Sequence, residues 1–420
     1  MSRFFTIAVV ALFVAQAALA VDYTFTGTAP GTDLWQTPAV WGGAGFPNSL
    51  TDTAYFSGAI AQTARTDNGG PYKVGNVTLG SGTGTGIINI GNFAGGLGLE
   101  IAAGATITKK DTSADRIYSK LTLDGNTTFN CTTGTTGSLY VYNLDGPGGV
   151  TKTGTGWMYM EGNVGNTYAG LTTVSGGRLY LSGTAGTQWI PSGGLKLAGR
   201  LQYNSPGNGD HIADNCPVEL AANGEIVANS NAETVGVATL TGNCTLWGSA
   251  ADLGFHFANS SAAVWTPGAK ITLTTYGKLV SVVAPKYYFG TDSTGLTASQ
   301  LAQIQFVDED ASGNLGTAYA AMFDPAHPGL LIAQTHVTTY WASDFNHDLV
   351  VNFKDYIILE GNFSKSNATN AMGDADGDGF VTFKDYIVLE GQFNKTSTPE
   401  PATIGLLIAG GLALLRRKAA

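Results

Sequence analysis

Short segments in which apolar and other residues alternate recur along the middle of this 420-residue chain. Such alternation places every second side chain on one face and is typical of half-buried β-strands, and clusters of Gly, Asn and Thr separate the segments. The clearest five span residues 121–123, 139–141, 158–160, 179–181 and 195–197. Their starts are 18, 19, 21 and 16 residues apart, a spacing that suits one turn of a parallel β-helix.

The pattern therefore predicts a mainly β fold for residues 21–340, a right-handed parallel β-helix or solenoid. A β-sandwich or jelly roll stays open as the alternative, although its turn signals recur about every 8–12 residues. Trp35 and Trp41 are expected to plug the first turn, with sugar binding as the other interpretation. Residues 296–306 form the one helix-to-strand passage and are expected to cover the far edge of the solenoid.

Near its C-terminal end the chain contains one twelve-residue motif written twice, thirty positions apart. Each copy places oxygen-bearing side chains at loop positions 1, 3, 5, 9 and 12, and a backbone carbonyl is expected from position 7. This is the ligand pattern of a calcium loop, because calcium takes six to eight oxygens and a tightly curled loop can bring them together. The predicted ligands are Asp344, Asn346, Asp348, Val350, Asn352 and Asp355 in the first loop, and Asp374, Asp376, Asp378, Phe380, Thr382 and Asp385 in the second.

A helical pattern follows each loop. Tyr356, Leu359 and Phe363 recur at i, i+3 and i+7, and Tyr386, Leu389 and Phe393 repeat that spacing. No amphipathic helix precedes either loop, and position 12 is Asp rather than Glu. Residues 341–396 therefore resemble a type I dockerin, a small α-helical module with two EF-hand-type calcium loops that docks onto cohesins.

The resemblance implies two calcium sites and a cohesin-type partner. Position 6 of a calcium loop favours a left-handed backbone, which Gly379 adopts readily and Leu349 only at a cost, so the first site is expected to be the weaker one. The contacts expected with a partner are Phe353, Lys354 and Tyr356 and their equivalents Phe383, Lys384 and Tyr386. The near-identity of the two copies would permit binding in two orientations. Two alternatives stay open: calcium only holds the module together, or the tyrosines form its small core.

Both ends of the chain carry the marks of sorting signals. Residues 1–20 combine Arg3, an apolar run over 4–14 and a small-residue cleavage site, which predicts a signal peptide and a mature start at Val21. Residues 397–420 contain the motif Pro399, Glu400 and Pro401, an uncharged run over 402–415 and a basic end. This run is shorter than the ~20 residues that a full span needs.

This tail resembles a PEP-CTERM sorting signal, with a plain tail anchor as the alternative. The resemblance implies recognition by an exosortase-type processing enzyme and transient attachment to the inner membrane through the C-terminal helix. The chain would then pass to the cell surface, the outer envelope or the extracellular matrix. The two terminal signals together predict an exported protein.

Residues 148–181 are similar to the autotransporter-associated β-strand repeat of secreted β-helical passengers. Gly148, Gly154, Gly170 and Gly177 allow tight corners in this stretch, and its apolar residues supply a core. The resemblance implies a fold and no particular activity.

Composition limits the functions that need consideration. Only 12% of residues are charged and the net charge is −10, which argues against nucleic acid as a partner. The three cysteines show no CxxC spacing, so a zinc site is not expected. One disulfide stays possible, but the odd number rules out a disulfide framework.

The solenoid shows no recognisable catalytic group. Adjacent carboxylates occur at 308–310, where we expect a solvated loop, the histidines are isolated, and no GxSxG motif occurs. We therefore predict a non-enzymatic surface protein with a role in display, adhesion or assembly, with a surface polysaccharide as a further possible partner. The alternative is a surface-attached polysaccharide-degrading β-helix enzyme, and a third possibility is an inert stalk.

Overall fold

The chain separates into two compact units, Met1–Ala333 and Gln334–Ala420, called unit 1 and unit 2 below. Their boundary lies close to residue 340, where the sequence predicts the end of the solenoid. The computed structural model describes residues 19–27, 33–43, 45–66, 70–91, 98–132, 137–183, 187–203, 210–228, 233–248, 254–275, 286–310, 312–324, 327–334, 341–346 and 350–395. Most of the expected signal peptide, Asp348 and the sorting motif Pro399–Glu400–Pro401 lie outside these residues.

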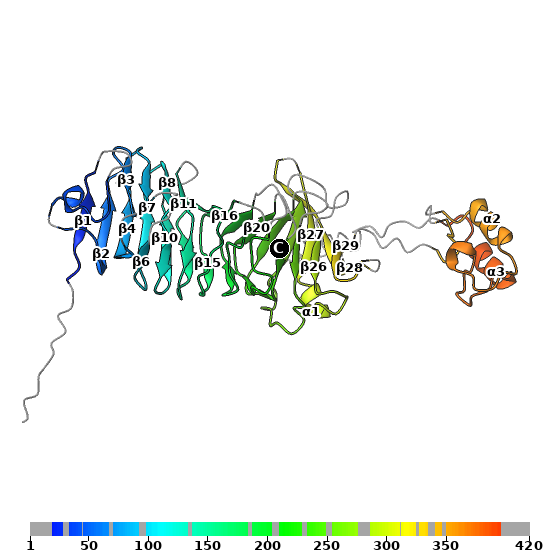
Figure 1. The fold of residues 1–420 in the computed structure, drawn as a ribbon. Coiled ribbons are helices and arrows are strands. Elements are labelled where there is room, and N and C mark those ends of the chain that lie inside the picture. Colours follow the sequence, from blue (N-terminus) through cyan, green and yellow to red (C-terminus); the bar gives the residue numbers. More distant parts are fainter. Residues whose placement is uncertain are drawn as a thin grey trace, which may run out of the picture. The chain divides into compact units, whose positions relative to one another are not determined.

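Unit 1 is a β-solenoid of about eight turns, whose strands follow one another in sequence order from blue to yellow in Figure 1. Within the described residues, sheet 1 contains 13 strands: β1 Asp22–Phe25, β2 Ser49–Phe56, β4 Tyr72–Leu79, β6 Leu99–Ile101, β7 Thr106–Lys109, β9 Leu121–Leu123, β10 Thr127–Cys131, β12 Leu144–Asp145, β13 Val150–Thr153, β15 Thr172–Val174, β17 Leu195–Leu197, β19 Val218–Leu220 and β22 Ala238–Leu240.

Sheet 2 contains 16 strands in the same described part of the chain: β3 Gln62–Ala64, β5 Ile88–Ile90, β8 Ala114–Ile117, β11 Ser138–Val141, β14 Trp157–Met160, β16 Arg178–Leu181, β18 Arg200–Tyr203, β20 Gly224–Ala228, β21 Glu233–Val235, β23 Cys244–Gly248, β24 Phe255–Phe257, β25 Ile271–Thr275, β26 Tyr287–Phe289, β27 Ile304–Glu309, β28 Leu315–Phe323 and β29 Leu330–Ala333. The short helices of unit 1 are η1 Pro38–Trp41 and α1 Ala298–Leu301.

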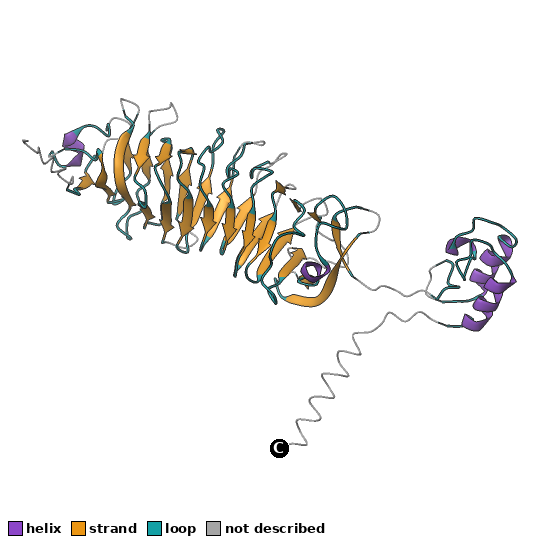
Figure 2. Cartoon of the chain, turned by 90° about the horizontal axis from the view of Figure 1, so that it is seen from below, coloured by secondary structure: helices purple, strands orange, loops and turns teal. Residues whose placement is uncertain are grey.

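Successive turns pair in parallel and in register, as the stacked orange arrows of Figure 2 show. Leu139 of β11 pairs with Met158 of β14, which pairs with Leu179 of β16 and then with Leu201 of β18. All four side chains are buried, so one inward row of apolar residues runs from turn to turn. The sequence prediction of a parallel solenoid is thus confirmed, and the β-sandwich alternative is wrong because its strands would be mainly antiparallel.

Glycines form the corners at which consecutive turns approach most closely. A Cβ atom added to Gly148 would meet the backbone of Gly125, and one added to Gly170 would meet the backbone of Gly148. A Cβ atom added to Gly193 would likewise meet the backbone of Gly170 in the preceding turn. Side chains at these corners would force the turns apart, so the glycine positions noted in the sequence have a direct steric reason.

Both ends of the solenoid are covered. Trp35 and Trp41 are buried against each other with ring centroids 5.0 Å apart, which confirms that they plug the first turn. At the other end, residues 296–306 contain helix α1, whose Thr297 and Gln300 form a capping box, and the start of β27. The outermost layer is an antiparallel addition, because β28 pairs with both β27 and β29. This change of direction ends the parallel stacking.

Charged side chains stand inside the apolar core of unit 1. Lys109 takes an inward position on β7, between Leu79 and Cys131 in the neighbouring turns, and is fully buried. Its ammonium lies 3.2 Å from the buried carboxylate of Asp115 and donates to the backbone carbonyl of Asp111. Lys152 is also buried and donates to the carbonyls of Thr153, Gly154 and Gly176. These lysines are satisfied by partners within the core.

A second buried polar cluster lies further along the solenoid. One oxygen of the Glu233 carboxylate accepts the backbone N–H groups of His211 and Ile212, at 2.8 and 2.6 Å. The other oxygen, the hydroxyl of Tyr203 and Nε2 of His211 have no hydrogen-bond partner among the described residues. Burial, and then the charge of Glu233, raises the pKa of Tyr203, so the two groups interact. Burial also raises the pKa of Glu233 to about 8.

Unit 2 is a small helical module with its own core. Its helices are α2 Phe353–Gly361, η2 Asn370–Met372 and α3 Phe383–Gln392 (purple in Figure 2). Each of α2 and α3 begins with a capping box, formed by Asn352 with Asp355 and by Thr382 with Asp385. The buried apolar residues are Phe345, Val351 and Leu359 from the first copy of the motif, Val381 and Leu389 from the second, and Ala368 from the connection between them.

Candidate functional site

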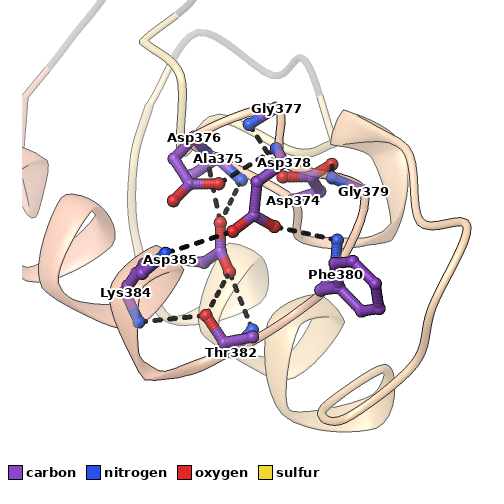
Figure 3. A network of polar contacts seen from close by, with 10 residues as sticks. All are labelled: Asp374, Ala375, Asp376, Gly377, Asp378, Gly379, Phe380, Thr382, Lys384 and Asp385. Atoms are coloured by element: carbon purple, nitrogen blue, oxygen red, sulfur yellow. Dashed lines mark hydrogen bonds and ion pairs between the residues drawn. The ribbon is translucent and has the colours of Figure 1, made fainter.

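The second loop of unit 2 brings three predicted metal ligands together. The carboxylates of Asp374, Asp376 and Asp378 each offer an oxygen, and these oxygens all lie within 4.8 Å of one another. Asp374 is buried, whereas the other two are exposed. Figure 3 shows the three side chains on one curled loop, with the Phe380 ring turned away from them. Phe380 can therefore contribute only its backbone carbonyl, as position 7 of a calcium loop requires.

Backbone hydrogen bonds hold this loop in its curled shape. Asp374 accepts the N–H of Gly377 through Oδ1 at 2.8 Å and that of Gly379 through Oδ2 at 2.9 Å. Both glycines have a left-handed backbone, with φ of 75° and 82°. Only glycine adopts this conformation without strain, so the residue at position 6 matters for the geometry of the loop. The corresponding residue of the first loop, Leu349, lies outside the described residues.

Asp385, at position 12, joins the start of the second loop to the start of α3. Its Oδ1 accepts the N–H groups of Ala375 and Asp376 at 2.7 and 3.1 Å, and its Oδ2 accepts that of Thr382 at 2.7 Å. Burial pushes the pKa of Asp385 upward, but these backbone donors together lower it below its ordinary value. The side chain is therefore ionised at neutral pH, and its remaining lone pairs can bind a cation.

The first loop repeats this arrangement. Asp355 accepts the N–H groups of Phe345 and Asn346 through Oδ1, and that of Asn352 through Oδ2. Asn352 caps α2 and also donates through Nδ2 to the carbonyl of Val350, the predicted position-7 ligand, at 2.9 Å. Asp344 is buried at the start of the loop. With Asp348 outside the described residues, the expected weaker affinity of this loop stays a prediction.

The donor set of the second loop fits calcium. It consists only of carboxylate, hydroxyl and carbonyl oxygens, whereas zinc and copper sites favour imidazole or thiolate. Asp374, Asp376, Asp378, Phe380, Thr382 and Asp385 would hold the ion. A bound cation would neutralise the mutual repulsion of the clustered carboxylates and so stabilise the loop.

The predicted partner contacts lie on the surface formed by α2 and α3. Phe353 and Phe383 are each 63% exposed, and each stacks on the tyrosine three residues later at 5.5 Å. Lys354 and Lys384 are exposed beside them. Tyr356 and Tyr386 are half-buried and pack against the core, so they take part in both the core and the surface.

Two hollows flank this tyrosine pair, and their linings are equivalent under the duplication of the motif. The larger, of about 470 Å³, is lined by Tyr356, Leu359, Glu360, Phe363, Phe383 and Tyr386. The smaller, of about 350 Å³, is lined by Phe353, Tyr356, Tyr386, Leu389, Glu390 and Phe393. The sequence alone did not predict a partner contact at Glu360, Glu390, Phe363 or Phe393. The i, i+7 spacing placed Phe363 on a helix, but α2 ends at Gly361 and the ring is 49% exposed.

The carboxylates at 308–310 do not form the expected solvated loop. Asp308 and Glu309 belong to strand β27 and are buried. Asp308 accepts a hydrogen bond from Tyr319, and Glu309 accepts one from Thr274, at 3.0 and 3.1 Å. Only Asp310 is exposed, where it shapes a turn by accepting the N–H groups of Ser312 and Asn314. The prediction failed because β27 continues to Glu309 between two neighbouring strands, β25 and β28, which supply Thr274 and Tyr319 as partners for the two carboxylates.

Among the described residues no helix has the length and apolar character needed to cross a membrane, and the tail 397–420 lies beyond them. The chain was compared with protein-family models, with curated proteins and with solved structures, and none of the three comparisons gave a match.

Proposed function

We propose that unit 2 is a calcium-dependent docking module of the dockerin type, carried by an exported β-solenoid protein of the cell surface or matrix. The observation that carries the proposal is the duplicated aromatic surface of α2 and α3. Soluble domains seldom expose several large apolar side chains together unless they meet a partner. Here Phe353, Ile357, Phe383 and Ile387 are all more than half exposed.

The pseudo-symmetry of this surface supports a partner that binds in either of two orientations. Phe353 and Phe383 have the same exposure, and the two hollows have equivalent linings. Aromatic side chains beside hollows are the usual anchors of protein interfaces, and a rim of charge fixes the register. Lys354, Lys384, Glu360 and Glu390 supply such a rim. A cohesin-type domain is the partner that we propose.

The two terminal signals expected from the sequence support a location of this module outside the cell. We propose that the signal peptide directs export, and that the tail with Pro399–Glu400–Pro401 is recognised by an exosortase-type enzyme after transient attachment to the inner membrane. The solenoid would then act in display, adhesion or assembly. We also propose a right-handed solenoid, because parallel crossover connections are right-handed in nearly all proteins.

The test is capture of a binding partner by the chain spanning residues 21–396, immobilised and exposed to the envelope fraction of its organism. With calcium present, one protein should be retained, and the chelator EDTA should release it. Phe353→Ala and Phe383→Ala alone should each weaken binding about twofold, because the other orientation remains. The double variant should weaken binding at least 30-fold, since a central aromatic anchor contributes about 2 kcal/mol or more.

The matched control is Leu315→Ala. Leu315 is a large apolar residue of β28 in unit 1 that is 57% exposed, and it lines neither hollow. Retention that persists in EDTA, or equal losses in Leu315→Ala and the double variant, would contradict the docking surface described here.

A further inference from the structure

An aromatic and cationic row crosses the outer face of sheet 2 in unit 1. Arg116 of β8 pairs with Tyr140 of β11, which pairs with Tyr159 of β14 and then with Tyr180 of β16. The residues next to each of them, such as Leu139, Met158 and Leu179, are buried in the core. Since strand side chains alternate between faces, the four row residues lie on the outer face, where Arg116, Tyr140 and Tyr159 are half-buried and Tyr180 is 9% exposed. They lie on four consecutive turns, spaced ~4.8 Å apart.

The tyrosine rings stack face to face. Ring centroids are 4.6 Å apart between Tyr140 and Tyr159, with planes at 14°, and 4.5 Å apart between Tyr159 and Tyr180, with planes at 2°. The Arg116 guanidinium lies over the Tyr140 ring, 4.9 Å from its centroid, and closes one end. The ring faces are thus covered by one another, and what remains for a ligand is a line of ring edges and hydroxyl groups.

A second arginine, Arg178, lies beside the row, two residues before Tyr180 on β16. Arg178 donates to the hydroxyl of Tyr180 at 2.6 Å, and its guanidinium lies 4.8 Å from the centre of the Trp157 ring. No carboxylate among the described residues forms an ion pair with Arg178, whereas Arg200, one turn further along, is paired with Glu225. An arginine with spare donors is notable on a chain of net charge −10. It offers a fixed pair of N–H groups to an anion.

The hydroxyl of Tyr159, at the centre of the row, is a donor at neutral pH. Burial, and then the neighbouring Tyr180 and Tyr140, raises the pKa of Tyr159 to about 12. Tyr159 is therefore protonated under physiological conditions and can both donate and accept hydrogen bonds. The surface thus presents one tyrosine hydroxyl on each of three consecutive turns, together with the guanidinium groups of Arg116 and Arg178.

We propose that this row, together with Arg178 and Trp157 beside it, binds a linear acidic polysaccharide that lies along the solenoid. A polymer of uronic acids has hydroxyl groups for the tyrosines and carboxylates for the arginines, repeated along an extended chain. Nucleic acid fits less well, because its bases need open ring faces on which to stack. The inference does not depend on calcium or on the docking proposed for unit 2.

The test measures binding of polygalacturonate to the full chain by isothermal titration calorimetry, with EDTA present so that calcium cannot bridge polymer and protein. Arg178→Gln is expected to weaken binding about tenfold, because a charge-assisted hydrogen bond to a carboxylate is lost. Tyr159→Phe keeps the ring stack, removes one hydroxyl and is expected to weaken binding about threefold. Thermal melting of both variants should match that of the original chain.

The matched control is Lys196→Gln, which removes one positive charge from sheet 1 of the same solenoid. Binding by this variant should change less than twofold, and neutral dextran should not bind. The proposal is overturned if the unaltered chain does not bind polygalacturonate, or if dextran binds equally well. It is also overturned if Lys196→Gln loses as much affinity as Arg178→Gln, because binding would then reflect charge alone.

Discussion

Replacing Lys109 with methionine is expected to lower the free energy of unfolding of unit 1 by about 3–5 kcal/mol. The lysine is fully buried, and its ammonium lies 3.2 Å from the carboxylate of Asp115, which is fully buried as well. Methionine has a similar length, so the substitution removes the charge and leaves little empty space. The cost arises because Asp115 would be left charged in the core without its counter-charge, or would have to become protonated.

Urea unfolding at pH 7, followed by circular dichroism, measures this effect. The double variant Lys109→Met with Asp115→Asn should recover most of the loss, because it removes both charges while the asparagine keeps an oxygen for the buried N–H of Ile88. Lys73→Met is the matched control. Lys73 is 48% exposed in a 3.0 Å ion pair with Glu100, and such surface pairs contribute less than about 1 kcal/mol. Equal losses for Lys109→Met and Lys73→Met would show that the buried pair has no special role.

Replacing Glu233 with glutamine is expected to stabilise unit 1 at high pH and to leave its stability at pH 4 nearly unchanged. Burial raises the pKa of Glu233 from its ordinary 4.5 to about 8, so the folded state binds a proton more tightly than the unfolded state. Its contribution to stability is complete below about pH 4.5 and is lost as the pH rises to about 8. Glutamine reproduces the neutral form and keeps an oxygen for the N–H groups of His211 and Ile212.

The size of this gain follows from the shift in pKa. One pKa unit corresponds to about 1.4 kcal/mol, so the gain at pH 9 is at most about 5 kcal/mol and becomes smaller if water enters the site. Urea unfolding between pH 4 and pH 9 should show a falling stability for the original chain and a flatter profile for Glu233→Gln. Glu219→Gln serves as the control, because Glu219 lies on an outward position of β19 and is paired with Lys196. A pH profile that Glu233→Gln leaves unaltered would exclude this group as the source.

The alternating pattern was enough to predict the solenoid, but not all of its contents. The segment Thr106-Ile107-Thr108-Lys109 alternates, and this places Lys109 on the same inward face as Ile107. A lysine is nevertheless expected at the surface, because burial of an ammonium needs partners that only the neighbouring turns supply. For the same reason the sequence did not reveal Glu233 as a core residue. Its partners, His211 and Ile212, lie about one turn earlier in the chain.

The candidate site was predictable to the extent that it is local. Asp374, Asp376 and Asp378 lie within one loop, so their spacing already implied that they converge. The hollows of unit 2 depend on how α2 packs against α3, and no local spacing contains that information. The row on sheet 2 was missed for a related reason: Tyr140, Tyr159 and Tyr180 lie about one turn apart in sequence, and only the parallel register stacks them.

Calorimetric titration of the full chain with calcium measures directly whether unit 2 binds the ion. Two ions should bind, and Asp374→Ala should abolish the tighter site, because that carboxylate is buried at the first position of the second loop. Calcium should also raise the melting temperature of unit 2, as a ligand of the folded state does. If the chain binds no calcium at millimolar concentration, or if Asp374→Ala leaves both sites unaltered, the calcium-dependent docking module is contradicted.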